Sequence, residues 1–178
     1  MDRYGAEYID ADHVVHQLYA AGTPETQAIA ARFGPDLLRD DGTIDRRRLG
    51  DIVMKDASAL RELEGILDPS VRAAIDDRIA HTSASVVVLD AIRLIEGGLY
   101  RRCDAVWVVV CDRALQIARL QSTRAMTAEQ AELRVAAQRP IAEKLQHATA
   151  VVRNNQTFDA LMAEVDEAWR TTVQPCLR

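Results

Sequence analysis

The run Ser85-Val86-Val87-Val88-Leu89-Asp90 decides the fold, because it is a short, continuously apolar segment that ends in an acid. Two further apolar runs cover residues 105–111 and 149–153, and residues 8–10 form a shorter one. Apolar residues without alternation are typical of strands that are buried on both faces of a parallel sheet. Segments with helical periodicity separate the runs, so the sequence predicts an α/β fold with a doubly wound parallel sheet.

Helical periodicity marks the segments between and beyond these strands. The predicted helices are residues 11–21, 25–33, 46–54, 57–67 and 70–80, one that opens at Thr127, and 158–171. Thr23-Pro24 places a capping residue and a first-turn proline before the second helix, and Thr127 with Glu129 and Gln130 predicts a capping box. Asp68-Pro69 predicts a break between two helices, because proline lacks the backbone donor that a helix interior needs.

The composition suits one domain, residues 1–178. A hydrophobic content of 48% is enough for an ordinary core. The net charge of −5 argues against nonspecific nucleic-acid binding, which needs a basic face. No apolar run approaches the roughly 20 residues that cross a bilayer. The three cysteines show no C-x-x-C spacing and favour a reduced compartment. We therefore expect a cytoplasmic protein without nucleic-acid or membrane partners.

Acids follow the first two strands at the points where those strands end. Asp10 and Asp12 come after the first strand, and Asp90 comes after the second. Ligands of open parallel sheets bind outside the carboxyl ends of the strands, so we expect these acids to converge on one cleft. Carboxylates there accept a proton from an attacking hydroxyl or hold Mg²⁺ through water. The alternative for each acid is a helix N-cap, a position that aspartate favours.

Five cations lie on or beside one helical region in the C-terminal half of the chain. They are Arg119, Arg124, Arg134, Arg139 and Lys144. Basic helices close over phosphates in many kinases, where their charges stabilise the transferred group. By charge count alone a solvated helix face explains them better, since three glutamates between positions 129 and 143 supply ion-pair partners.

His13 and His16 lie three residues apart beside the N-terminal acids. This spacing permits zinc ligation, but no further ligand pattern supports it. A surface or partly packed pair explains the two histidines better.

The order of several short motifs resembles the dephospho-CoA kinase family over essentially the whole chain. The N-terminal motifs are Gly5-Ala6-Glu7-Tyr8-Ile9-Asp10-Ala11-Asp12, Arg32-Phe33-Gly34, Asp41-Gly42-Thr43-Ile44-Asp45-Arg46, Leu67-Asp68-Pro69-Ser70-Val71-Arg72 and Val88-Leu89-Asp90-Ala91-Ile92-Arg93-Leu94-Ile95-Glu96. The downstream motifs are Gln116, Arg119-Leu120, Arg134, Ala137-Gln138, Glu143-Lys144, Ala148 and Asn154. Each motif is moderately specific, and their succession is highly so.

The resemblance implies transfer of the γ-phosphate of ATP to the ribose 3′-hydroxyl of dephospho-CoA, the last step of coenzyme A synthesis. It implies that Asp12 contacts and deprotonates that hydroxyl, with Asp10 beside it. Asp10 and Asp90 are then expected near Mg²⁺, and Asp90 also near the acceptor. Further implied roles are substrate binding by Arg72 and Glu96, phosphate contact by Arg134, and ATP contact by Asn154, Arg119 and Arg124. The helical acceptor-binding region would cover about residues 43–81, and a lid about 123–146.

Several features depart from the family pattern. Asp68 stands where the family usually has histidine, Thr149 replaces an aspartate, and residues 92–96 replace Pro-Leu-Leu-Phe-Glu. The sequence contains no phosphate-binding G-x-x-x-x-G-K-[ST] motif, and Asp2-Arg3-Tyr4 resembles the last turn of the helix that follows this loop. We therefore expect the central first strand to be missing and the chain as written to have negligible kinase activity.

Three interpretations of function remain open. The protein is a dephospho-CoA kinase whose start has been assigned too late, a non-catalytic module that binds CoA or a nucleotide, or a kinase of another small nucleotide or nucleoside.

A missing central strand would also leave a gap in the sheet. Either residues 86–89 and 106–110 pair directly, or another chain fills the gap. The second case predicts a homo-oligomer through exposed sheet edges.

Overall fold

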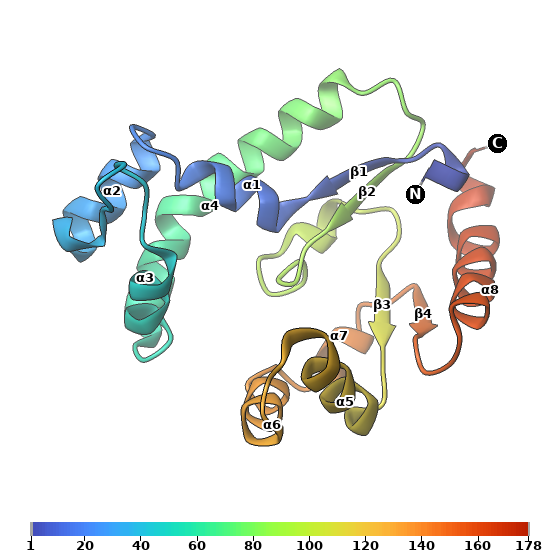
Figure 1. Cartoon of the computed structure of the whole chain (residues 1–178). Coiled ribbons are helices and arrows are strands. Elements are labelled where there is room, and N and C mark those ends of the chain that lie inside the picture. The colour runs from blue at the N-terminus through green and yellow to red at the C-terminus, as the bar shows by residue number, and fades with distance from the viewer. Residues whose placement is uncertain (1, 178) are drawn as a thin grey trace. The chain divides into compact units, whose positions relative to one another are not determined.

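The computed structural model describes residues 2–177, and the chain divides into two compact units, Met1–Ile92 and Arg93–Arg178. Each unit contains a two-stranded sheet with its own helices (Figure 1). The strands of both sheets run parallel, which confirms the predicted α/β class.

The sheet of the first unit joins β1 (Glu7–Asp10) to β2 (Val87–Asp90). Ile9 in the middle of β1 is fully buried, as expected for a strand of a parallel sheet. The register pairs Asp10 with Asp90. Because both strands end at this pair, the two aspartates stand at the carboxyl edge of the sheet.

The described helices of this unit are the 3-10 turns Asp2–Tyr4 and Pro35–Leu37 and the α-helices α1 (Ala11–Leu18), α2 (Pro24–Phe33), α3 (Arg46–Val53) and α4 (Ala57–His81). The side chains of Thr23, Asp45 and Asp56 accept hydrogen bonds from backbone N–H groups in the first turns of α2, α3 and α4. The predicted cap at Thr23, with Pro24 in the first turn, is confirmed.

Helix α4 runs through Pro69, so the predicted break there is wrong. One face of the helix stays buried on both sides of the proline, through Leu63, Leu67, Val71 and Ile75. Their spacing keeps these side chains on one stripe. Burial of each contributes about 1.5–3 kcal/mol relative to exposure. Together they outweigh the roughly 3 kcal/mol that an internal proline costs.

The helices enclose the hydrophobic core of the first unit. Its buried members are Ile29, Leu37, Ile44, Leu49, Val53, Ala59, Leu63 and Leu67. Leu37 and Ile44 come from the connection between α2 and α3, which turns at Gly42 with a φ of 79°. A Cβ atom at Gly42 would lie 3.1 Å from the Cβ of Ala21, so both the backbone angle and the close approach require glycine here.

The second unit joins β3 (Trp107–Val110) to β4 (Ala150–Arg153). Its described helices are the 3-10 turn Leu99–Arg102, α5 (Arg113–Arg124), α6 (Ala128–Ala136), α7 (Ile141–Leu145) and α8 (Phe158–Ala168), then a π-helical turn Trp169–Val173 and a 3-10 turn Gln174–Leu177. Thr127 and Gln130 form the predicted capping box at the start of α6.

Thr149 joins the starts of β3 and β4. Its Oγ1 accepts a hydrogen bond from Val106 N at 2.8 Å and donates one to Val106 O at 2.9 Å. The departure from the family pattern at this position therefore has a local structural role.

In the first unit β2 pairs with β1, and in the second unit β3 pairs with β4. Among the described residues, no helix has the length and apolar character that crossing a membrane requires.

Candidate functional site

Asp10 and Asp90 lie side by side at the ends of β1 and β2. Oδ1 of Asp10 accepts a hydrogen bond from His13 N at 3.0 Å, so Asp10 caps α1, as one of the two interpretations of this residue predicts. Oδ2 of Asp90 accepts a hydrogen bond from the Tyr8 hydroxyl at 2.7 Å. This hydrogen bond, together with burial and the nearby acids, raises the pKa of Tyr8 to about 12. Tyr8 therefore remains a donor to Asp90 at neutral pH.

Asp12 lies in the first turn of α1, close to both of these acids. Burial raises the pKa of Asp12 above its ordinary value, the charges of Asp10 and Asp90 raise it further, and the charge of Arg46 opposes the rise. The three predicted acids therefore share one electrostatic environment at the carboxyl edge of the sheet. A carboxylate with a raised pKa is a stronger proton acceptor.

A cavity of about 310 Å³ opens beside Asp12 and is lined by α1, α3 and α4. Its lining residues are Asp12, Val15, Tyr19, Arg46, Leu49, Gly50, Val53 and Leu63. Burial raises the pKa of Tyr19 above its ordinary value, so the phenol stays protonated at neutral pH. The polar groups of Asp12, Tyr19 and Arg46 share the lining with apolar side chains, and polar groups that converge in a cavity are a feature of small-molecule sites.

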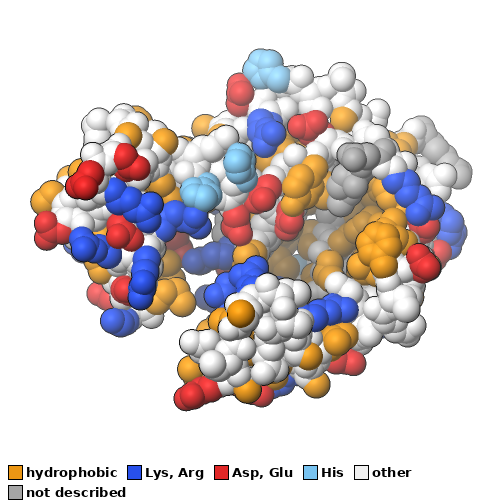
Figure 2. Space-filling model, viewed as in Figure 1, with side chains coloured by type: hydrophobic (Ala, Val, Ile, Leu, Met, Phe, Trp, Pro, Cys, Tyr) orange, Lys and Arg blue, Asp and Glu red, His pale blue; other side chains and the backbone are white. Residues whose placement is uncertain are grey.

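Arg46 contributes a cation to this cavity from the first turn of α3. Its Nη1 lies 2.7 Å from Nε2 of His16 on α1 and 3.4 Å from Nδ1 of the same ring. Figure 2 shows histidine and acidic side chains together on the viewed face where α1 lies, with basic side chains beside them. Sequence reasoning misses Arg46 as a site residue. The available signal was its place at the end of the motif Asp41-Gly42-Thr43-Ile44-Asp45-Arg46, directly after a capping aspartate.

The neighbouring His13 has a different environment. Its Nε2 lies 3.2 Å from Nε2 of Gln17 on the same helix. Among residues 2–177, no group of three or more His, Cys, Asp and Glu side chains is arranged to hold a metal ion by itself. The structure therefore gives no support to zinc ligation by His13 and His16.

The two further residues predicted to bind substrate lie in different units. Arg72 is half-buried on α4, toward the C-terminal end of that helix from the cavity residue Leu63. Oε1 of Glu96 lies 3.6 Å from Nζ of Lys144, and the Glu96 side chain is 11% exposed. Its Oε2 is buried without a hydrogen-bond partner among the described residues. Within its own unit, Glu96 therefore acts as the counter-charge of Lys144.

The second unit brings Arg119 and Asn154 together. Nη1 of Arg119 donates a hydrogen bond to Asn154 O at 2.9 Å and lies 3.5 Å from Sγ of Cys111. The Asn155 side chain accepts a hydrogen bond from Asp112 N and donates one to Asp112 Oδ1, both at 2.9 Å. These contacts join the carboxyl ends of β3 and β4, which is the edge where parallel sheets bind ligands.

Arg124 at the end of α5 and Arg134 on α6 are exposed. Other cations of the region have acidic partners, since Arg139 lies 3.8 Å from Glu143 and Arg113 pairs with Glu132. No ion pair involves Arg124 or Arg134 in the part of the chain that the structure describes. The two guanidinium groups are therefore accessible to a ligand.

Known proteins are similar to this chain over most of its length. The family model described as dephospho-CoA kinase matches residues 1–160. The dephospho-CoA kinase of Symbiobacterium thermophilum is 41% identical over 169 residues, which cover 93% of this chain and 71% of the relative. The dephospho-CoA kinase of Geobacter sulfurreducens is 38% identical over 172 residues, which cover 95% of this chain and 87% of the relative.

Solved structures share the fold. The crystal structure of TT1252 from Thermus thermophilus has a TM-score of 0.80 at 24% identity, covering 95% of this chain and 86% of that one. Dephospho-CoA kinase from Campylobacter jejuni has a TM-score of 0.65 at 24% identity and the same coverage. The predicted P-loop-kinase-like α/β fold is consistent with both.

Proposed function

Because the chain belongs to the dephospho-CoA kinase family, we propose that it binds dephospho-CoA in the cavity beside Asp12 and transfers the γ-phosphate of ATP to it. The observation that carries this proposal is the position of Asp12, a carboxylate of raised pKa on the wall of a cavity that also contains a guanidinium. Such a carboxylate is suited to accept the proton of the ribose 3′-hydroxyl as the phosphate is transferred.

Asp12 suits the role of base better than Asp10. The Asp10 carboxylate caps α1 through its hydrogen bond with His13 N, so one of its oxygens already has a partner. Asp12 lines the cavity, and its neighbours raise its pKa. A base needs both access to the hydroxyl and affinity for its proton.

The cavity matches one part of the acceptor. A volume of about 310 Å³ is at the lower end of the roughly 300–1,000 Å³ of small-molecule sites. It therefore suits the adenosine portion of dephospho-CoA rather than the whole molecule. Val15 offers apolar surface to the base in front of the buried Leu49 and Leu63, and Arg46 offers donors to the phosphates that follow the ribose.

Mg²⁺ and ATP are the expected cofactors of this reaction. Asp10 and Asp90 supply adjacent carboxylates, and Mg²⁺ is usually held by one or two carboxylates together with waters and substrate phosphates. These two residues therefore fit the ion, which would neutralise charge on the transferred phosphate when bound. We assign Arg124 and Arg134 to the phosphates and Arg119 and Asn154 to the adenine end of ATP.

The proposal also assigns roles to two helical regions and a cellular compartment to the reaction. We assign residues 43–81 to acceptor binding and residues 123–146 to the lid, and we place the reaction in the cytoplasm.

Two measurements on the 178-residue chain test the proposal. Calorimetric titration should show binding of dephospho-CoA. An assay of ADP release then decides between ATP-dependent transfer to it and the negligible activity that the absence of a G-x-x-x-x-G-K-[ST] motif from the sequence predicts. Asp12→Asn should retain binding and lower the transfer rate about 10²–10⁴-fold, the usual contribution of a general base. Absence of dephospho-CoA binding overturns the proposal.

Binding without transfer instead identifies the non-catalytic binding module. The absence of a G-x-x-x-x-G-K-[ST] motif from the printed sequence is the observation that favours this second candidate.

A further inference from the structure

Tyr19 follows directly on α1 and lines the cavity beside Asp12. Its backbone N–H donates a hydrogen bond to His16 O at 3.3 Å, and its carbonyl oxygen accepts one from Ile44 N at 3.2 Å. The ring is half-buried and packs against the hydrophobic core of the first unit. The backbone and the ring are therefore held in place before a ligand arrives, which lowers the entropic cost of a contact that this side chain makes.

The hydroxyl of Tyr19 has no hydrogen-bond partner within residues 2–177. Tyr8 differs in this respect, because its hydroxyl donates to Oδ2 of Asp90 at 2.7 Å. A tyrosine hydroxyl usually finds a partner when it is removed from bulk water, and it can both donate and accept a hydrogen bond. The Tyr19 hydroxyl is therefore available to a ligand in the cavity.

The cavity offers few other hydrogen-bonding side chains. Among its lining residues, Asp12, Tyr19 and Arg46 carry polar groups, and the others are apolar or glycine. The proposed function assigns Asp12 to the ribose 3′-hydroxyl and Arg46 to the phosphates. The adenine base has hydrogen-bonding groups of its own, and burying such groups without a partner costs free energy. Tyr19 is the polar side chain of this lining that remains for the base.

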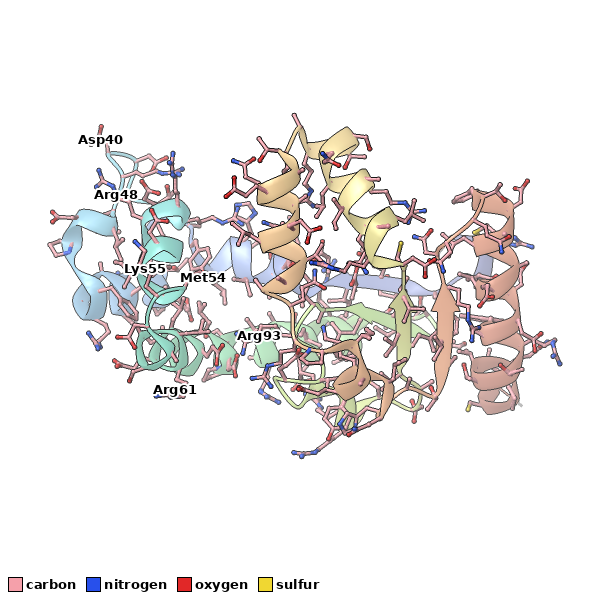
Figure 3. The ribbon with its side chains drawn as sticks, turned by 90° about the horizontal axis from the view of Figure 1, so that it is seen from below. Asp40, Arg48, Met54, Lys55, Arg61 and Arg93 are labelled. Atoms are coloured by element: carbon pink, nitrogen blue, oxygen red, sulfur yellow. The ribbon has the colours of Figure 1, made fainter. Side chains whose placement is uncertain are left out.

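The spacing along α1 agrees with this division of tasks. Asp12, Val15 and Tyr19 form the α1 wall of the cavity, and their spacing places them on one helix face. Tyr19 follows Asp12 by two turns, a rise of about 10 Å along a helix. An adenosine has a similar length from its 3′-oxygen to the far edge of its base. In Figure 3, Arg48 marks α3 and Arg61 marks α4, the two helices that supply the rest of the lining.

We propose that Tyr19 is a specificity-determining residue for the acceptor, whose hydroxyl forms a hydrogen bond with the adenine base of dephospho-CoA while Asp12 contacts the ribose. This inference rests on the proposed function of the cavity. Adenine presents ring-nitrogen acceptors beside an amino donor, and a phenolic hydroxyl pairs with either kind of group. A base of the same shape without such groups would leave the Tyr19 hydroxyl unpaired, so the hydrogen bond favours adenine.

Calorimetric titration of the 178-residue chain with two ligands tests the proposal. One ligand is dephospho-CoA, and the other is its analogue with indole in place of adenine, which keeps the bicyclic shape but has no hydrogen-bonding group on the base. Tyr19→Phe removes the hydroxyl and keeps the ring. It should weaken binding of dephospho-CoA about 3–10-fold, the magnitude of one neutral hydrogen bond. It should not weaken binding of the indole analogue, on which the hydroxyl has no partner.

Tyr100→Phe is the matched control. Tyr100 belongs to the second unit, where its ring centroid lies 4.4 Å from that of His147, and it is not a lining residue of the cavity. Phenylalanine keeps this ring contact, so the affinity for both ligands should stay unchanged. Thermal unfolding followed by circular dichroism establishes that each variant is folded before titration. Equal weakening by Tyr19→Phe and Tyr100→Phe overturns the role of Tyr19.

The two ligands also separate this inference from the proposed function. If the unchanged chain does not bind dephospho-CoA, the proposed function is wrong, and the role of Tyr19 is wrong with it. If the chain binds dephospho-CoA and Tyr19→Phe binds it equally well, the role of Tyr19 alone is wrong. Equal weakening of both ligands by Tyr19→Phe also overturns that role, because the hydroxyl would then act on a part of the ligand other than the base.

Discussion

Residues 1–92 bury a continuous set of apolar side chains, whereas residues 93–178 bury few of those described. In the first unit, α3 and α4 contribute Leu49, Val53, Leu63 and Leu67 to one core. In the second, every residue of α5 and α7 is at least partly exposed, and α6 buries Ala131. Burial in a hydrophobic core therefore contributes more to the stability of the helices of the first unit than to that of α5, α6 and α7.

This difference corresponds to the two proposed tasks. The walls of the acceptor cavity belong to helices that share a core, so the cavity is formed before a ligand arrives. The exposed arginines of the proposed lid belong to helices with few buried contacts, and such helices open at low free-energy cost. We infer that these helices gain stability when they bind phosphate groups.

Truncation of one leucine in each unit gives the largest expected contrast. Leu63→Ala removes a side chain that is 6% exposed in the core of the first unit and should lower the free energy of unfolding by about 2–5 kcal/mol. Leu133→Ala on α6 removes one that is 65% exposed and should change it by no more than about 0.5 kcal/mol. Urea denaturation measures both. Equal losses would show that the second unit has a core of comparable importance.

A smaller contrast lies within the second unit, between two ion pairs. Lys144→Met leaves the mostly buried Glu96 carboxylate without this cation and should cost about 1–2 kcal/mol, below the 3–5 kcal/mol of a fully buried pair because Lys144 is 25% exposed. Arg139→Met is the control, since Arg139 and Glu143 are 64% and 54% exposed. Its cost should be at most about 0.5 kcal/mol.

The double variant Lys144→Met/Glu96→Gln separates the stabilisation by the ion pair from the cost of leaving the Glu96 carboxylate buried and unpaired. It should recover part of the stability that Lys144→Met loses, because no charge is then left buried. No recovery in urea denaturation would show that Lys144 stabilises the unit through its packing instead.

Local signals in the sequence predicted the strands and the helix caps. Residues 85–90 contain the observed β2, and Thr127 opens α6 with its capping box. Both features depend on residues that are near one another in the chain. Pro69 marks the limit of this reasoning, because the rule for an isolated helix predicted a break. The buried stripe along α4 overrides it.

Long-range contacts of the site could not be predicted in the same way. The hydrogen bond from Tyr8 to Asp90 joins residues 82 positions apart, and the contact between Arg46 and His16 joins residues 30 apart. The first depends on the register of β1 and β2, and the second on the packing of both α1 and α3 against α4. No local pattern encodes either arrangement, so the sequence identified the acids but not the residues that hold them.

Two glycines offer a prediction in which stability and binding diverge. Gly50 on α3 lines the acceptor cavity, Gly65 lies on α4, and a Cβ atom at either position meets nothing within 4 Å. Gly50→Ala and Gly65→Ala should each raise the free energy of unfolding by about 0.5–1 kcal/mol, since glycine is a poor helix former. Only Gly50→Ala should weaken dephospho-CoA binding, because its methyl group enters the cavity. Equal affinities would place the acceptor elsewhere.

The smallest expected effect concerns two aspartates of the first unit whose pKa values move in opposite directions. The pKa of Asp12 is raised, chiefly by burial, so its charged form destabilises the fold at neutral pH, and this penalty disappears as the pH falls through the raised pKa. The backbone N–H of Arg48 lowers the pKa of Asp45, so Asp45 contributes stability that is present at neutral pH and is lost as the pH falls. Asp12→Asn should therefore raise the free energy of unfolding at neutral pH, by no more than about 0.5 kcal/mol.

That gain should vanish toward pH 3.8, the ordinary carboxyl pKa. Asp45→Asn should show the opposite sign, with a loss at neutral pH that shrinks in acid. Urea denaturation at a series of pH values checks both variants. A loss of stability at neutral pH in Asp12→Asn would mean that the Asp12 carboxylate is held by a favourable contact in the folded state. Such a carboxylate would be a weaker proton acceptor, and the assignment of the base to Asp12 would lose its physical ground.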